Sequence, residues 1–200
     1  MEAQMSNRNS KLSIQDLCYI SLFTALIAVL AQISIPLPGG VPLTLQTLAV
    51  PLAGIVLGPK RGTISALLYV LLGAIGVPVF ANFTGGLGIV VGVTGGFIVS
   101  FPIMALFAGF AVNKSVKNPM LWVWLVLGAL VNYAIGTVWF MVATGTGLGA
   151  ALAACVVPFI PTAIIKIILT GFFGVMLRRA LMKANILQPE GSIRQVRHAE

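Results

Sequence analysis

The chain alternates long apolar runs with short breaks, and six of these runs approach the length of a membrane-spanning helix. They cover residues 17–35, 43–57, 63–77, 95–112, 120–143 and 158–181. A bilayer core about 30 Å thick requires roughly 17–25 apolar residues per helix, and the second and third runs are the shortest. The pattern therefore predicts an all-α integral membrane protein with six transmembrane helices.

The predicted helices form one membrane domain between two polar tails. We expect an N-terminal tail at residues 1–12, a six-helix domain at 13–183 and a C-terminal tail at 184–200. The start of the chain is polar up to Lys11 and the first apolar run is long enough to remain in the membrane, so no cleaved signal peptide is expected. Cys18 and Cys155 fall near opposite faces of the membrane, too far apart for a disulfide.

Lysine and arginine are distributed unevenly between the connections. The connections at 36–42, 78–94 and 144–157 contain none. Eleven of the twelve basic residues lie in the other connections or near the chain ends: Arg8, Lys11, Lys60, Arg61, Lys114, Lys117, Arg178, Arg179, Lys183, Arg194 and Arg197. Basic loops stay in the cytoplasm, so this side and both termini are predicted to be cytoplasmic in a multi-pass protein of the cell membrane.

Composition supports the membrane assignment. Hydrophobic residues make up 58% of the 200 residues and charged residues only 8%, and the mean hydropathy is +1.05. Soluble domains carry about 25% charged residues. A net charge of +8 could suggest nucleic acid as a partner, but these charges lie between apolar runs, where they orient the chain in a bilayer. No nucleic-acid partner is expected.

The twelfth basic residue, Lys166, lies inside the sixth run. It follows Pro158 by eight residues, which is roughly 12 Å along a helix. A lysine at this depth costs on the order of 2.5–3.5 kcal/mol, so it normally faces a cavity and has a partner. The acidic residues Glu2, Asp16, Glu190 and Glu200 all lie in the tails or at the start of the first helix. We therefore expect the anion to be a small carboxylate ligand that enters from outside.

The three uncharged connections are apolar and rich in glycine, and they predict the rest of the pocket. Irregular backbone at the membrane is tolerated where it lines or covers a cavity, although tight turns at the interface would look similar. Gln46 and Asn82 are candidate hydrogen-bonding residues on the same leaflet as Lys166, and Tyr133 is a candidate wall residue. Asn132 is either a further ligand contact or a helix-packing residue.

Enzyme functions do not fit the sequence. The histidine His198 is the third residue from the end of the chain, so neither a buried Ser-His pair nor a histidine metal site is expected. The glycines at 54–58 lack the following Lys-Ser/Thr of a phosphate-binding loop. We expect no catalytic residues, no metal and no cofactor, and transport energy would come from a partner subunit.

Small residues of the first helix are a candidate surface for docking such a subunit. Ser21 and Ala25 are four residues apart, as are Thr24 and Ala28. Small residues at this spacing let membrane helices approach closely. Packing within the chain would use the same pattern.

Four segments, in this order, resemble the signatures of the BioY family. They are Gly40-Val41-Pro42-Leu43-Thr44-Leu45-Gln46-Thr47, Gly76-Val77-Pro78-Val79-Phe80, Thr94-Gly95-Gly96-Phe97, and Pro158-Phe159-Ile160-Pro161 followed by Lys166. BioY proteins are the biotin-binding S components of energy-coupling factor (ECF) transporters of bacteria and archaea. The resemblance implies a six-helix S-component fold with a biotin pocket under its external loops. It also implies a transmembrane coupling subunit and a pair of ABC ATPases as partners, in a bacterial plasma membrane.

The resemblance also implies roles for individual residues. Lys166 corresponds to the family lysine that pairs with the valerate carboxylate of biotin, and Asn82 to a ligand-contacting asparagine. The family usually has an aspartate at position 163, where this chain has Ala163, and a proline at the position of Val93.

The predicted function is therefore capture of biotin for an ECF-type ABC transporter. Predicted ligand-binding residues are Lys166, Asn82, Gln46 and Tyr133, with Ala163 at the altered family position. Predicted docking residues are Ser21, Ala25 and Ala28. The alternatives are a self-sufficient facilitator or channel for small anions and an S component for another vitamin.

Overall fold

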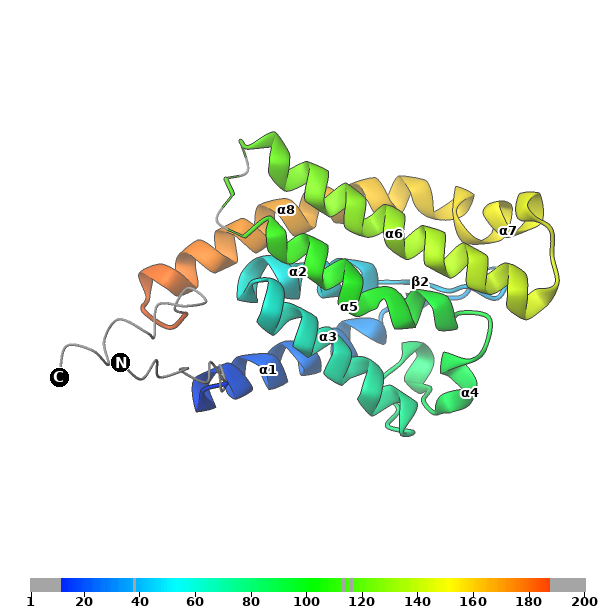
Figure 1. Ribbon diagram of the computed structural model, residues 1–200, viewed down its shortest axis with the longest axis horizontal. Coiled ribbons are helices and arrows are strands. Elements are labelled where there is room, and N and C mark those ends of the chain that lie inside the picture. The colour runs from blue at the N-terminus through cyan, green and yellow to red at the C-terminus, as the bar shows by residue number, and fades with distance from the viewer. Residues whose placement is uncertain (1–11, 38, 113, 116, 188–200) are drawn as a thin grey trace, which may run out of the picture.

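The computed structural model describes residues 12–37, 39–112, 114–115 and 117–187, and these fold into a bundle of helices (Figure 1). The longer helices are α1 (Ile14–Ala31), α2 (Gln46–Leu57), α3 (Pro59–Ala74), α5 (Gly95–Phe110), α6 (Pro119–Thr144) and α8 (Ile160–Lys183). Shorter helices are α4 (Leu87–Val90), α7 (Leu148–Cys155) and the 3-10 turns η1 (Ala81–Phe83) and η2 (Val157–Phe159). The predicted, mostly helical fold is confirmed. The predicted tail residues 1–11 and 188–200 lie outside the described ranges.

A short β ribbon departs from the predicted all-α fold. Strand β1 (Ser34–Ile35) pairs antiparallel with β2 (Leu43–Thr44). The first helix was predicted to continue to Ile35, but it ends at Ala31. Pro36 accounts for the extended backbone just before it, because the residue before a proline is disfavoured in helical backbone. In the ribbon, Ser34 pairs with Thr44 and Ile35 with Leu43.

Two of the predicted irregular connections also contain short helices. The helix α4 lies in the second of the three uncharged connections and α7 lies in the third. The sequence of α7, Leu-Gly-Ala-Ala-Leu-Ala-Ala-Cys, is rich in alanine, which has the highest helix propensity. These connections are therefore more ordered than their glycine content suggested.

Three helical stretches are long and apolar enough to cross a membrane. They are Ile14–Ala31 with 18 residues, Pro119–Thr144 with 26 residues, and Leu148–Lys183 with 36 residues. The other long helices are shorter: α2 has 12 residues, which at about 1.5 Å per residue give roughly 18 Å. Length and apolar character make this a membrane protein.

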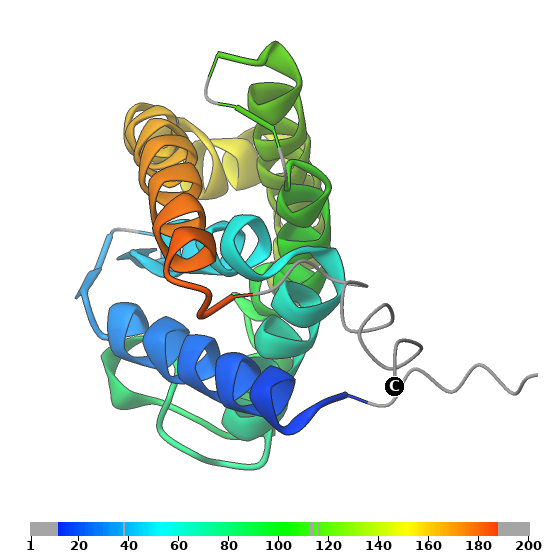
Figure 2. The ribbon, with the colours of Figure 1, turned by 90° about the vertical axis from the view of Figure 1, so that its left-hand side faces the viewer.

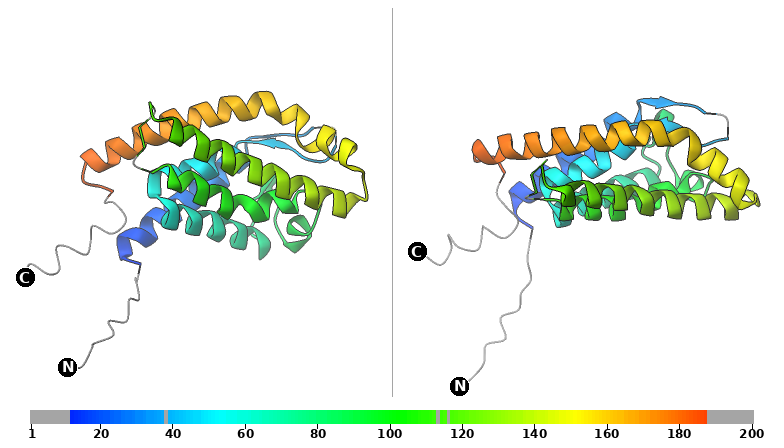
Figure 3. Two further views of the ribbon diagram at one scale, coloured as in Figure 1. Left: turned by 45° about the horizontal axis from the view of Figure 1, so that its top comes forward. Right: turned by 90° about the horizontal axis from the view of Figure 1, so that it is seen from above.

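Apart from Lys166, the basic residues of the helices gather at one end of the bundle. The start of α1, the junction of α2 and α3, and the end of α8 lie at this end, whereas the β ribbon, α4 and α7 lie towards the other (Figures 1 and 3). Lys60 and Arg61, predicted to lie in a connection, are inside the first turn of α3. Arg61 pairs with Asp16 of α1, with Nε and Oδ1 2.6 Å apart. This buried ion pair joins α1 to α3.

The helix α2 is the centre of the bundle. Figure 2 shows it between α8 on one side and α1 on the other, and ten of its residues are buried. Gly54 lets α5 come close, because a Cβ at this position would lie 2.2 Å from the backbone oxygen of Ala105. The central position of α2 matters for the site, since its first residues follow β2 directly.

The chain folds back onto α1 after α8. Asn185 has a φ of 54°, a left-handed conformation that asparagine adopts more readily than most residues. This turn brings Leu187 into the main apolar core, where it is 2% exposed. The hydroxyl of Tyr19 in α1 donates to the backbone oxygen of Ile186.

Candidate functional site

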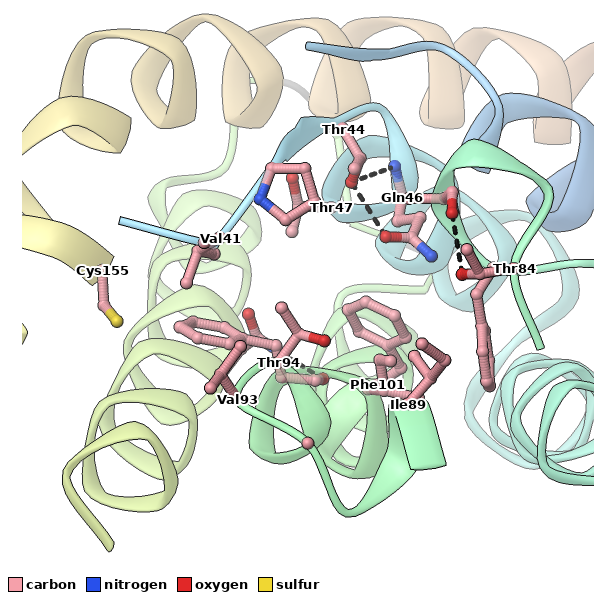
Figure 4. A pocket seen from close by; sticks show the side chains of 18 of the residues that line it. Val41, Thr44, Gln46, Thr47, Thr84, Ile89, Val93, Thr94, Phe101 and Cys155 are labelled. Carbon is pink, nitrogen blue, oxygen red and sulfur yellow. Dashed lines mark hydrogen bonds between the residues drawn. The ribbon is translucent and has the colours of Figure 1, made fainter. Parts of the chain in front are cut away.

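A cavity of about 330 Å³ lies at the end of the bundle that holds the ribbon and the short helices. Figure 4 shows Thr44, Gln46 and Thr47 on one wall, opposite Ile89, Thr94 and Phe101. Cys155 lies towards one end and Thr84 towards the other. Such a volume lies within the roughly 300–1,000 Å³ range of small-molecule pockets.

Four predicted ligand-binding residues line this one cavity. They are Lys166, Asn82, Gln46 and Tyr133, which come from α8, η1, α2 and α6. The fold therefore brings together residues that are up to 120 positions apart in the chain (46 to 166). Ala163 is half-buried one turn before Lys166, but it is not among the residues that line the cavity.

Lys166 is buried and its ammonium group contacts only neutral oxygens among the described residues. The side chain is 9% exposed. Its Nζ donates to the backbone oxygen of Thr44 at 2.6 Å and to Oγ1 of Thr47 at 3.0 Å. An ammonium group has three N–H donors, so one more acceptor can be accommodated. The lysine thus ties α8 to the start of α2 and presents a positive charge to the cavity.

No carboxylate of the described chain neutralises this charge. Asp16 is the one acidic residue within the described ranges, and it pairs with Arg61 at the opposite, basic end of the bundle. A buried cation without a counter-ion is costly in a medium of low dielectric constant. The cavity is therefore suited to an anionic ligand group.

Gln46 belongs to a hydrogen-bonded chain on the same wall. Its Oε1 accepts from Oγ1 of Thr44 at 2.9 Å, and its Nε2 donates to the hydroxyl of Tyr69. Tyr69 in turn donates to the backbone oxygen of Val79 at 3.1 Å. The amide of Gln46 is thus fixed in orientation, while each end retains capacity for one further hydrogen bond.

Asn82 lies on a strained loop that forms the rim of the cavity. Asn82 and Phe83 have φ values of 58° and 55°, in the left-handed region. Gln32, the residue directly after α1, holds this loop: its Oε1 accepts from the backbone N–H of Phe83 at 2.8 Å, and its Nε2 donates to the backbone oxygen of Val79 at 3.2 Å. The side chain of Asn82 is exposed and lines the cavity, so it is placed to contact a ligand from the rim.

The opposite wall comes from α5 and α6. The ring of Tyr133 contacts that of Phe97 edge to face, with centroids 6.5 Å apart. Trp139 of α6 donates through Nε1 to the backbone oxygen of Gly92 at 2.9 Å and so anchors the loop after α4. Several lining residues were not singled out from the sequence, among them Ile89, Phe101 and Cys155. Their apolar side chains carry no pattern that separates a cavity wall from a core.

The predicted docking residues lie outside the cavity on α1. Ser21 and Ala25 are exposed, and Ala28 is half-buried against the main core. Thr24 is buried and donates to the backbone oxygen of Ser65 in α3 at 3.0 Å. The Thr24 side of α1 therefore serves internal packing, and the Ser21–Ala25 side is open to a neighbour.

Two other sequence expectations concern cysteine and metal sites. Cys18 and Cys155 are free thiols, as predicted. Within the described ranges, no group of three or more His, Cys, Asp or Glu side chains comes together to hold a metal ion. The polar side chains that line the cavity carry an ammonium group, amides, hydroxyls and the thiol of Cys155.

Comparisons with known proteins give a consistent result. The model of the BioY family matches residues 4–183. The chain is 44% identical to the "Probable biotin transporter BioY" of Pyrococcus horikoshii, over 76% of this chain and 89% of the relative. It is 39% identical to "Biotin transporter BioY2" of Lactococcus lactis, over 89% and 97% of the two chains.

A solved structure has the same fold. It is described as the S-component for biotin from an ECF-type ABC transporter, and it superposes with a TM-score of 0.77 at 30% identity. The match covers 83% of this chain and 92% of the other.

Proposed function

The chain belongs to the BioY family, and on this premise we propose that it captures biotin as the S component of an ECF-type ABC transporter. It is a transport protein and not an enzyme. The observation that carries the proposal is the position of Lys166, a buried cation that lines a cavity without a carboxylate partner among the described residues. Biotin offers a carboxylate to such a cation.

The remaining chemistry of the cavity also suits biotin. Its valerate carboxylate would pair with Lys166, and its fused ring system would lie among apolar side chains such as Phe97, Phe101 and Ile89. Asn82 would contact the ligand from the rim, and Gln46 and Tyr133 from the walls. Thiamine and riboflavin have no carboxylate for Lys166, so the pocket favours biotin over these vitamins.

We extend the proposal to the arrangement in the membrane. The six longer helices cross the bilayer, the short α2 being flanked by its neighbours, and the termini and the basic end face the cytoplasm. The end with the cavity, whose connections carry no charge, then faces outwards. The membrane is the plasma membrane of a bacterium or archaeon. Biotin would enter the cavity from outside, beneath the loop that carries Asn82.

The transport partners would be a transmembrane coupling subunit and a pair of ABC ATPases. The exposed small residues Ser21 and Ala25 on α1 give the coupling subunit a place for close helix packing. The variant Ala25→Trp should abolish co-purification with these subunits while biotin binding persists. Leu130→Trp, an exposed position on α6, is the matched control and should assemble normally. Equal assembly of both variants would show that the subunit docks elsewhere.

The experiment that tests the function is calorimetric titration of the purified, detergent-solubilised protein with biotin, thiamine and riboflavin. We expect saturable binding of biotin and no heat of binding from the other two vitamins. Uptake of labelled biotin into proteoliposomes, with and without the ATPase module, separates capture from facilitated diffusion. Absence of biotin binding would overturn the proposal, and flux of small anions through the chain alone would support the channel alternative.

A further inference from the structure

The amide of Asn132 is a second polar feature of the cavity, on the wall opposite Lys166. Asn132 lies in the middle of α6, is 2% exposed and lines the cavity. A buried amide must be fully hydrogen-bonded or it destabilises the protein. The partners of Asn132 therefore indicate which of its atoms remain available.

Both donors of this amide are already used. The Nδ2 group donates to the backbone oxygen of Phe97 at 3.0 Å and to Oγ of Ser100 at 2.7 Å. Ser100 itself donates to Phe97 at 3.0 Å, so its oxygen is free to accept. Since the backbone oxygen of Phe97 can only accept, the NH₂ group must face α5. This network fixes the orientation of the amide without ambiguity between nitrogen and oxygen.

The acceptor Oδ1 consequently lies on the other side of the amide, away from Phe97 and Ser100. Among the residues that the structure describes, no donor to Oδ1 is found. A ligand that fills the cavity shields this oxygen from water, and an acceptor that is buried without a partner costs about 1–3 kcal/mol. A ligand N–H in the cavity would remove this cost.

The two walls of the cavity thus offer a ligand different hydrogen-bonding groups. Lys166 and its partners at the start of α2 provide a positively charged donor, whereas Asn132 on α6 provides a neutral acceptor. A ligand that fits both has a carboxylate at one end and an N–H at the other. We propose that Oδ1 of Asn132 accepts a hydrogen bond from a ureido N–H of biotin and makes the pocket selective for ligands with that N–H. This inference rests on the proposed binding of biotin.

The test compares biotin with an analogue whose cyclic urea is replaced by a cyclic carbonate, which keeps the ring and its C=O but lacks both N–H groups. Affinities are measured by calorimetric titration of the wild-type protein, Asn132→Leu and Ser100→Ala. The wild type should bind biotin about tenfold or more tightly than the carbonate, since the carbonate leaves the acceptor unpaired. In Asn132→Leu this preference should fall by a similar factor.

Ser100→Ala is the matched control, because it removes a hydrogen bond of the same network and retains Oδ1. It should keep the preference for biotin. If Asn132→Leu does not fold, Asn132→Ala, which also lacks an acceptor, gives the same comparison. An unchanged preference in the Asn132 variant, or equal wild-type affinity for the two ligands, would overturn the inference and leave the proposed function standing. A wild-type protein that binds no biotin would overturn both.

Discussion

Replacement of Lys166 by methionine is the most direct test of the anion site. Methionine approximates the length and apolar stem of lysine but carries no charge, so the cavity keeps its shape. The change removes the donor to Thr44 and Thr47 and the positive charge that faces the ligand. It therefore separates the electrostatic role of Lys166 from its packing.

The expected loss follows from the burial of the ammonium group. At 9% exposure, the interaction with a carboxylate is only weakly screened by water. Removing one partner of such a buried, hydrogen-bonded charge pair costs about 2–5 kcal/mol, which corresponds to roughly 30- to 4,000-fold weaker binding of biotin. The loss should be confined to ligands that carry the carboxylate.

The assay is calorimetric titration with biotin and with biotin amide, which is uncharged. We expect the wild-type protein to prefer biotin strongly and Lys166→Met to bind the two ligands with similar, weak affinity. Lys183→Met is the control, because Lys183 lies in the same helix but is exposed at the end distant from the cavity. If Lys166→Met weakened both ligands by the same factor, the lysine would only tie α8 to α2 and the reasoning would be refuted.

Three further predictions concern positions around the site. Ala163→Asp should tighten biotin binding, because a carboxylate one turn before Lys166 would orient the ammonium group; titration showing weaker binding would argue against this. Gln32→Leu should weaken biotin binding about 3- to 30-fold by releasing the loop that carries Asn82, and unchanged affinity would show that the loop is held without it. Gly54→Ala should lower the melting temperature, because overpacking reduces the free energy of unfolding by about 1–3 kcal/mol. Gly149→Ala should leave the melting temperature unchanged, because no atom lies within 4 Å of the added carbon.

Much of the site could be predicted because a charged residue in an apolar run, and glycine-rich connections without charge, are both unusual in a membrane protein. Lys166 interrupts an apolar run, and no acidic residue of comparable depth occurs in the sequence. That contrast was enough to predict an anionic ligand. The glycine-rich, uncharged connections predicted the end of the bundle at which the pocket lies, although their short helices were missed.

The partners of each residue could not be predicted, because they depend on contacts between distant helices. Gln46 and Asn132 are both amides in apolar runs, and the sequence does not distinguish them. In the fold, Gln46 is held at both ends by Thr44 and Tyr69, whereas Asn132 has used only its donors. The same reasoning applies to α1, where Thr24 contacts α3 and Ser21 stays exposed.

The sequence by itself determined that this is a helical membrane protein and which of its ends is basic. It also determined that a lysine lies within an apolar run without an acidic partner, which predicts an anionic ligand. These properties follow from hydrophobic burial and charge, which depend on residue type and spacing along the chain. Only the tertiary structure decided where α1 ends, which residues share the cavity, and which hydrogen-bonding atoms face it. Those features depend on the direction of the backbone and on how the helices pack. A hydrogen bond forms only where the fold brings a donor within about 3 Å of an acceptor.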